Sequence, residues 1–191
     1  MKKAIIALIM TMSFVQVFGQ DKNDTLKIIE QKVGEINQDT NYWISTFTNE
    51  AFLDTGFINQ PGQGYGQLTG FFKHGKVCKI RELIGISLLQ EVAITEYYFV
   101  DGKLIYVYEQ EKQGPDIFID SEGTIDHRID EPTFEVRYYF DDDKLIGLVE
   151  KGVRTTILLP NEDFFDSQSK EGQLLHSAQK YHALFSIKYK Q

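Results

Sequence analysis

The residues that most often carry out catalysis or bind metals are few in this chain and lie far apart. The histidines are His74, His127, His176 and His182, and the single cysteine is Cys78. No two histidines stand four residues apart, and one cysteine cannot supply a cluster of thiolates, so the spacing argues against a zinc site. The sequence also lacks the Gly-x-Ser-x-Gly motif of a nucleophilic serine. These patterns indicate a protein that is not an enzyme and needs no metal or other cofactor.

The cysteine lies in a run that is typical of a β-strand. Cys78 follows Val77 and precedes Lys79 and Ile80, and a small apolar residue in such a run is usually buried. A single thiol cannot form a disulfide within the chain, so burial of apolar side chains must stabilise the fold. We therefore expect Cys78 to be a structural residue.

Acidic residues gather between residues 116 and 131 and again at Asp141–Asp143. A calcium ion takes about six to eight oxygen ligands, which a binding loop supplies at alternating positions. The stretch Asp120–Gly123 lacks that alternation. The sequence therefore favours a solvated acidic loop, although it leaves calcium binding by residues 116–131 open.

The charge balance of the chain is acidic. Its 191 residues include 28 Asp and Glu against 20 Lys and Arg, which gives a net charge of −8. Phosphate backbones and anionic lipid surfaces repel such a chain, so nucleic acid is not expected as a partner.

Residues 1–19 have the pattern of a secretory signal peptide. Two lysines precede an apolar run over residues 4–17, and a polar segment follows Gly19. The apolar run is too short to cross a bilayer comfortably, and no later stretch is long enough to form an integral membrane segment. We therefore expect cleavage after Gly19, a single domain over residues 20–191, and a periplasmic or secreted location.

One helix is expected near each end of this domain. Over residues 25–38, apolar residues recur at three- and four-residue spacing and form one stripe. A second helix is expected after a cap at Asp166 or Ser167. Its apolar stripe consists of Leu174, Leu175, Ala178, Tyr181 and Phe185.

Between the helices, the pattern is that of strands joined by turns. Residues 71–77, 98–104 and 139–145 share two aromatic residues, a polar turn and a lysine. Asp101-Gly102 is a strong hairpin signal, because a two-residue turn needs positive φ angles that Asp and Gly tolerate. The turn at Asp141–Asp143 is expected to be looser because it lacks glycine.

The strands around the central turn are apolar on both faces, which is typical of strands covered from both sides. Residues 134–138 alternate between apolar and charged and predict an outer strand with one buried face. Further strands are expected at residues 42–47 and 153–159. The expected fold class is α+β, with an antiparallel β-meander of about seven or eight strands and both helices packed on one face.

The repeated segments also carry a resemblance. They read QLTGFFK at residues 67–73, EYYF before GKLI at residues 96–105, and RYYF before KLI at residues 137–146. This pattern resembles uncharacterised small secreted proteins and lipoproteins of Gram-negative bacteria, particularly Bacteroidota. The resemblance covers about residues 67–150 and implies a fold but no catalytic residues. Unlike the lipoproteins, this chain has no cysteine at the end of the signal segment to accept a lipid, which argues against independent anchoring to a membrane.

The export signal, the aromatic sheet and the lack of catalytic motifs favour a binding function. We expect a non-enzymatic protein that binds another component of the cell envelope, plausibly as an accessory subunit of an outer-membrane or secretion assembly. Exposed aromatic residues in irregular segments concentrate binding energy, which favours Trp43, Phe57 and Tyr65 as binding residues.

Two alternatives stay open. A half-open sheet with an aromatic face could carry a lipid or another apolar ligand, which requires a large apolar cavity between helix and sheet. A hydrolase with a dispersed site requires a cleft where carboxylates or a histidine converge.

Overall fold

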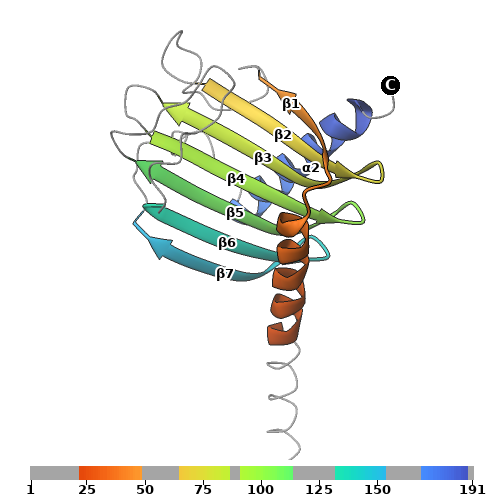
Figure 1. The fold of residues 1–191 in the computed structure, drawn as a ribbon. Coiled ribbons are helices and arrows are strands. Elements are labelled where there is room, and N and C mark those ends of the chain that lie inside the picture. Colours follow the sequence, from red (N-terminus) through yellow and green to blue (C-terminus); the bar gives the residue numbers. More distant parts are fainter. Residues whose placement is uncertain (1–21, 49–64, 87–90, 114–131, 154–168, 189–191) are drawn as a thin grey trace, which may run out of the picture. The chain divides into compact units, whose positions relative to one another are not determined.

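The computed structural model describes residues 22–48, 65–86, 91–113, 132–153 and 169–188. They fall into two compact units, Met1–Gln38 and Asp39–Gln191. The described part of the first unit is a helix, and that of the second is a seven-stranded sheet followed by helix α2 (Figure 1). The α+β fold class and the antiparallel meander predicted from the sequence are therefore confirmed.

The N-terminal helix spans residues 22–38 and begins slightly earlier than predicted. Ile29, in the middle of the predicted apolar stripe, is the buried position of this helix. On the exposed side, the Gln31 amide donates a hydrogen bond to the Glu35 carboxylate (2.9 Å), and the Lys32 ammonium lies 3.4 Å from it. The hydrogen bond and then the lysine charge lower the pKa of Glu35. That this helix shares one face of the sheet with α2 stays a prediction.

Every strand of the sheet pairs with its neighbour in the sequence, so β1 and β7 are the two edges. The strands are β1 (Trp43–Phe47), β2 (Tyr65–Lys73), β3 (Lys76–Ile86), β4 (Glu91–Val100), β5 (Lys103–Gln113), β6 (Phe134–Asp141) and β7 (Lys144–Gly152). The strands predicted at residues 42–47 and 134–138 are confirmed. The one predicted at 153–159 falls, after its first residue, outside the described residues.

Three hairpins have two-residue turns in which both residues have positive φ. The turns are His74-Gly75, Asp101-Gly102 and Asp142-Asp143, with φ between 45° and 80°. The third turn is as tight as the other two, so the prediction of a looser turn there is wrong. Aspartate reaches the left-handed region without glycine, because its short polar side chain can hydrogen-bond to the nearby backbone.

Each of these hairpins also carries a β-bulge beside its pair of aromatic residues. The register shifts between Phe71 and Phe72, between Tyr98 and Phe99, and between Tyr139 and Phe140. The extra residues on the partner strands are Cys78, Ile105 and Ile146. A bulge bends its strand and increases the local twist, so the sequence repeat corresponds to a repeated bend in the sheet.

Helix α2 (Lys170–Lys188) crosses one face of the sheet (Figure 1). The hydroxyl of Ser169 accepts a hydrogen bond from the Gly172 amide (3.2 Å), so the cap lies two residues after the predicted Ser167. The predicted apolar stripe of this helix is confirmed. Leu174, Ala178, Tyr181 and Phe185 are buried, and Leu175 packs partly buried against the same core.

Gly70 on β2 allows α2 to approach the sheet closely. A Cβ atom at this position would lie 2.8 Å from a ring carbon of Phe185, which is closer than a side chain can come. The Phe185 ring is fully buried, with its centroid 5.1 Å from that of Phe47 and 5.8 Å from that of Phe72. This aromatic cluster attaches the C-terminal half of α2 to β1 and β2.

We call the side of the sheet under α2 the helix face and the opposite side the far face. On the far face, the rings of Tyr98, Tyr106 and Tyr139 meet edge to face, with centroid distances of 5.5 Å and 5.2 Å along the row. All three are buried, as are Leu83 and Ile94 on the same face. The prediction that the central strands are buried on both faces is therefore confirmed.

Candidate functional site

Within the sheet, large apolar side chains are exposed on the two edge strands. On β1, Trp43 is 52% exposed and Ile44 is 54% exposed. On β7, Leu148 is 52% exposed and Val149 is 51% exposed. Trp43 and Leu148 lie on the helix face, and their neighbours lie on the far face, because successive residues of a strand point to opposite sides. The two edges therefore carry matching pairs of exposed side chains.

The indole ring of Trp43 is supported by the sheet beneath it. It packs edge to face on Phe72, the residue opposite it on β2, with 4.9 Å between ring centroids. The chain before β1 is also held in place. The Asp39 carboxylate accepts a hydrogen bond from the backbone N–H of Asn41 and forms an ion pair with Lys73. A supported aromatic ring offers a large contact area at a low cost in conformational entropy.

The backbones of the two edges differ in how well they can accept a further strand. β7 contains Lys144 and Lys151 and a bulge at Ile146, which are features that discourage pairing at an edge. β1 has no charged residue and pairs with β2 in an unbroken register. Of the two edges of the described sheet, β1 therefore carries fewer features that discourage pairing with a further strand.

The structure places the predicted binding residues in different surroundings. Trp43 is exposed, as expected, but in a regular strand and not in an irregular segment. Tyr65 begins β2 opposite Gly85, seven residues from the Phe72 that supports Trp43. At about 3.3 Å per residue this separation is roughly 23 Å, so Trp43 and Tyr65 do not form one patch.

Phe57 lies outside the described residues. Sequence reasoning missed Ile44, the second exposed apolar residue of β1. The signal that could have indicated it was the pair of large apolar residues at the start of a short strand. Successive side chains point to opposite faces, so one face alone cannot bury both.

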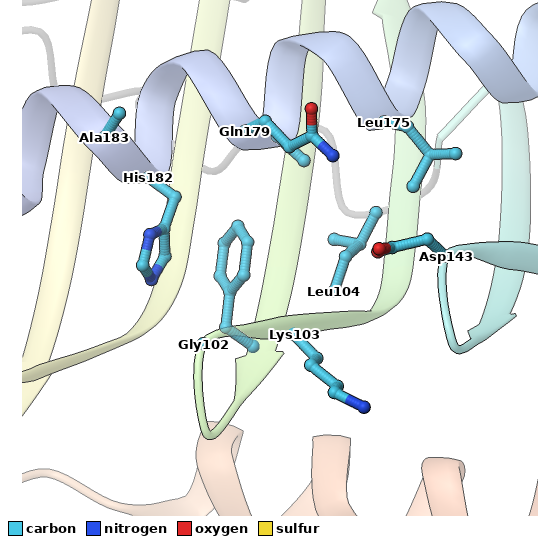
Figure 2. A pocket seen from close by; sticks show the side chains of 10 residues that line it. Gly102, Lys103, Leu104, Asp143, Leu175, Gln179, His182 and Ala183 are labelled. Atoms are coloured by element: carbon cyan, nitrogen blue, oxygen red, sulfur yellow. The ribbon is translucent and has the colours of Figure 1, made fainter.

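A pocket of about 210 Å³ opens between α2 and the turn that joins β4 to β5 (Figure 2). Its apolar wall includes Phe99, Leu104, Leu175 and Ala178, and its polar lining includes Lys103, Asp143, Gln179 and His182. The His182 ring lies 5.0 Å from the Phe99 ring. Burial lowers the pKa of His182, so its imidazole is neutral at pH 7.

Four glutamates of the sheet accept hydrogen bonds from tyrosine hydroxyls. The pairs are Glu82 with Tyr97 (3.3 Å) and Tyr181 (2.7 Å), Glu96 with Tyr98 (2.6 Å), Glu109 with Tyr138 (3.0 Å) and Glu135 with Tyr108 (2.8 Å). Three of these glutamates also have a lysine or arginine within 3.4 Å. In the described part of the chain, Glu82 forms no ion pair, and its burial raises its pKa.

Several residues that could take part in catalysis are not arranged for it. Burial raises the pKa of the half-buried Cys78 thiol, which keeps it protonated. The Ser186 hydroxyl lies 3.5 Å from Nδ1 of His182, but Ser186 does not line the pocket. Among the described residues, no three histidine, cysteine or acidic side chains come close enough together to hold a metal ion.

Comparison with known proteins does not identify the chain. No protein family, no curated protein and no solved structure matches it. Neither of the helices described above is long and apolar enough to cross a membrane. The candidate site is therefore defined by geometry alone, as the exposed edge formed by Trp43 and Ile44 on β1.

Proposed function

We propose that this protein is a non-enzymatic binding protein of the cell envelope, and that it binds an extended segment of another protein along the outer side of β1. The observation that carries the proposal is the position of β1 at an edge of the described sheet, with Trp43 exposed on one face and Ile44 on the other. An added strand would gain main-chain hydrogen bonds from β1 and apolar contacts on both faces.

The support for this reading comes from the contrast between the two edges. The charged residues and the bulge of β7 are the usual means by which a sheet avoids unwanted pairing. β1 has neither, and the Trp43 ring is held by Phe72, as binding hot spots commonly are. The envelope location rests on the signal-peptide pattern of residues 1–19.

The carrier alternative receives less support from the described residues. The pocket beside α2 measures about 210 Å³. Sites for small molecules usually measure about 300–1,000 Å³, so a lipid tail would not be enclosed there. The hydrolase alternative also receives less support, because the pocket brings one aspartate and one histidine together without a serine, threonine or cysteine among the described residues of its lining.

The test is an affinity purification of the tagged protein from its own cell envelope in mild detergent, followed by mass spectrometry. The chain offers a variant and a matched control. Ile44→Lys and Val149→Lys each place a charge on the far face of an edge strand, at 54% and 51% exposed positions. We expect a stoichiometric protein partner with the wild type and with Val149→Lys, and its loss with Ile44→Lys.

A second pair repeats the test on the helix face. Trp43→Ala should weaken the complex, whereas Leu148→Ala, at the same 52% exposure, should not. Loss of the partner in both members of a pair, or in neither, would overturn the assignment to β1. A bare monomer in every preparation would overturn the binding function itself. The mass of the purified chain also tests cleavage after Gly19.

A further inference from the structure

The pocket beside α2 is separate from the β1 edge and has a defined shape and charge. It lies where the turns of two hairpins, β4–β5 and β6–β7, meet the helix (Figure 2). The turns are linked to each other, because the Lys103 ammonium lies 2.6 Å from the Asp142 carboxylate. Both turns are tight, with positive φ angles at Gly102 and Asp143. The pocket is therefore formed by short turns and a helix and not by a long loop.

The charge directed into the pocket is negative. The ammonium group of Lys103 points away from α2, whereas the Asp143 carboxylate extends from its turn toward Leu104 (Figure 2). His182 contributes a neutral imidazole, because burial lowers its pKa. Among the described residues that line the pocket, the remaining polar side chain is Gln179, which can both donate and accept hydrogen bonds.

The inner wall of the pocket is apolar. Phe99, Leu104 and Ala178 are buried, and each lines the pocket. A small ring or a short alkyl group placed against these side chains would displace water from apolar surface, which is favourable. A volume of about 210 Å³ limits the ligand to a molecule smaller than the usual drug-sized compounds.

We propose that this pocket binds a small organic amine. Its apolar group would lie against Phe99 and Leu104, and its ammonium group would donate hydrogen bonds to the Asp143 carboxylate and the Gln179 amide oxygen. An ammonium group carries three donors and no acceptor, so a carboxylate and an amide oxygen are complementary partners. The neutral His182 adds no positive charge, and the ammonium of Lys103, which also lines the pocket, is paired with the Asp142 carboxylate at 2.6 Å.

The test is a titration of the purified full chain with benzylamine, followed by NMR. We expect saturable shifts at the side chains of Gln179 and His182 and a dissociation constant on the order of 1 mM, as suits a ligand of this size. The neutral analogue benzyl alcohol should bind about fivefold more weakly, because one charge pair at about 4 Å in water strengthens binding by about that factor. Benzoate, which is anionic, should bind more weakly still.

A pair of variants of one turn then locates the charge. Asp143→Asn should weaken benzylamine binding by about fivefold. Asparagine tolerates the positive φ of this position, so the turn is retained. Asp141→Asn changes the net charge equally but does not line the pocket, and it should leave binding unchanged. The proposal is overturned if the amine produces no saturable shifts, if benzyl alcohol or benzoate binds as well as the amine, or if the two variants behave alike.

Discussion

Glu82 and Glu96 both accept hydrogen bonds from tyrosine hydroxyls, but they lie on opposite faces of the sheet. On the helix face, Glu82 is held by Tyr97 and Tyr181 and has no ion-pair partner among the described residues. On the far face, Glu96 accepts a hydrogen bond from Tyr98 and lies 2.7 Å from the Lys79 ammonium.

The two sites differ in how the protein stabilises a carboxyl group that is largely shielded from water. Glu82 is 8% exposed, and burial raises its pKa because the ionised form loses its contact with water. The carboxylate of Glu96 is balanced by the Lys79 ammonium, which also lies over the Tyr98 ring, 5.0 Å from the ring centroid. The helix face also contains an ion pair, between Glu109 and Lys170 at 2.6 Å, so the contrast concerns the two glutamates and not the two whole faces. Glu82 is held by hydroxyl groups, and Glu96 by a hydroxyl group and an ammonium group.

The largest expected effect tests the packing of the helix face. Phe185→Ala removes a fully buried ring and should lower the free energy of unfolding by about 3–5 kcal/mol. Urea denaturation measures the change. Ile187→Ala on the same helix is the control, because that side chain is 66% exposed, and it should change stability by about 0.5 kcal/mol or less. Equal effects would mean that the C-terminal part of α2 is not anchored through Phe185.

The second prediction separates the hydrogen bonds that the Glu82 side chain accepts from its ability to ionise. Glu82→Ala removes the acceptor that Tyr97 and Tyr181 share and should cost about 2–3 kcal/mol. Glu82→Gln keeps an oxygen acceptor for one hydroxyl and presents an NH2 group to the other hydroxyl, which can accept a hydrogen bond from it, so this variant should cost about 1 kcal/mol or less at neutral pH. Thermal and urea unfolding of both variants provide the measurement. A larger loss in the glutamine variant than in the alanine variant would contradict the hydroxyl-held arrangement.

A smaller effect is expected on the far face. Glu96→Gln removes one charge of a pair in which Lys79 and Glu96 are 15% and 14% exposed, and it should cost about 1–2 kcal/mol. A double-mutant cycle with Lys79→Met isolates the coupling between the two side chains. Additive effects of the two substitutions would show that the pair contributes no interaction energy.

The pH dependence of stability gives the finest test of the comparison. Because the pKa of folded Glu82 is raised above its ordinary value of 4.5, the folded state keeps its proton after the unfolded chain has lost it. This contribution to stability is therefore fully present below pH 4.5 and is lost as the pH rises through the raised pKa. Glu82→Gln should remove this decline. An unchanged decline in the variant would assign it to another group.

Much of the fold was predictable from local sequence. The positive φ angles at Asp101-Gly102 follow from residue type, and the stripe of α2 follows from its spacing. The tight turn at Asp142-Asp143 was missed because two aspartates signal positive φ less strongly than glycine does. Of the two residues that define the proposed binding surface, the sequence indicated Trp43, and Ile44 was overlooked.

The sequence by itself determined which segments form hairpins and helices, because turn chemistry and periodicity act over a few neighbouring residues. Only the tertiary structure decided which distant residues meet. Tyr181 reaches Glu82 across 99 positions of the chain, and Phe185 lies over Gly70. Only the strand order made β1 an edge and exposed Trp43 and Ile44 there. Such contacts depend on how the whole sheet and α2 pack together, and no local pattern of residues encodes them.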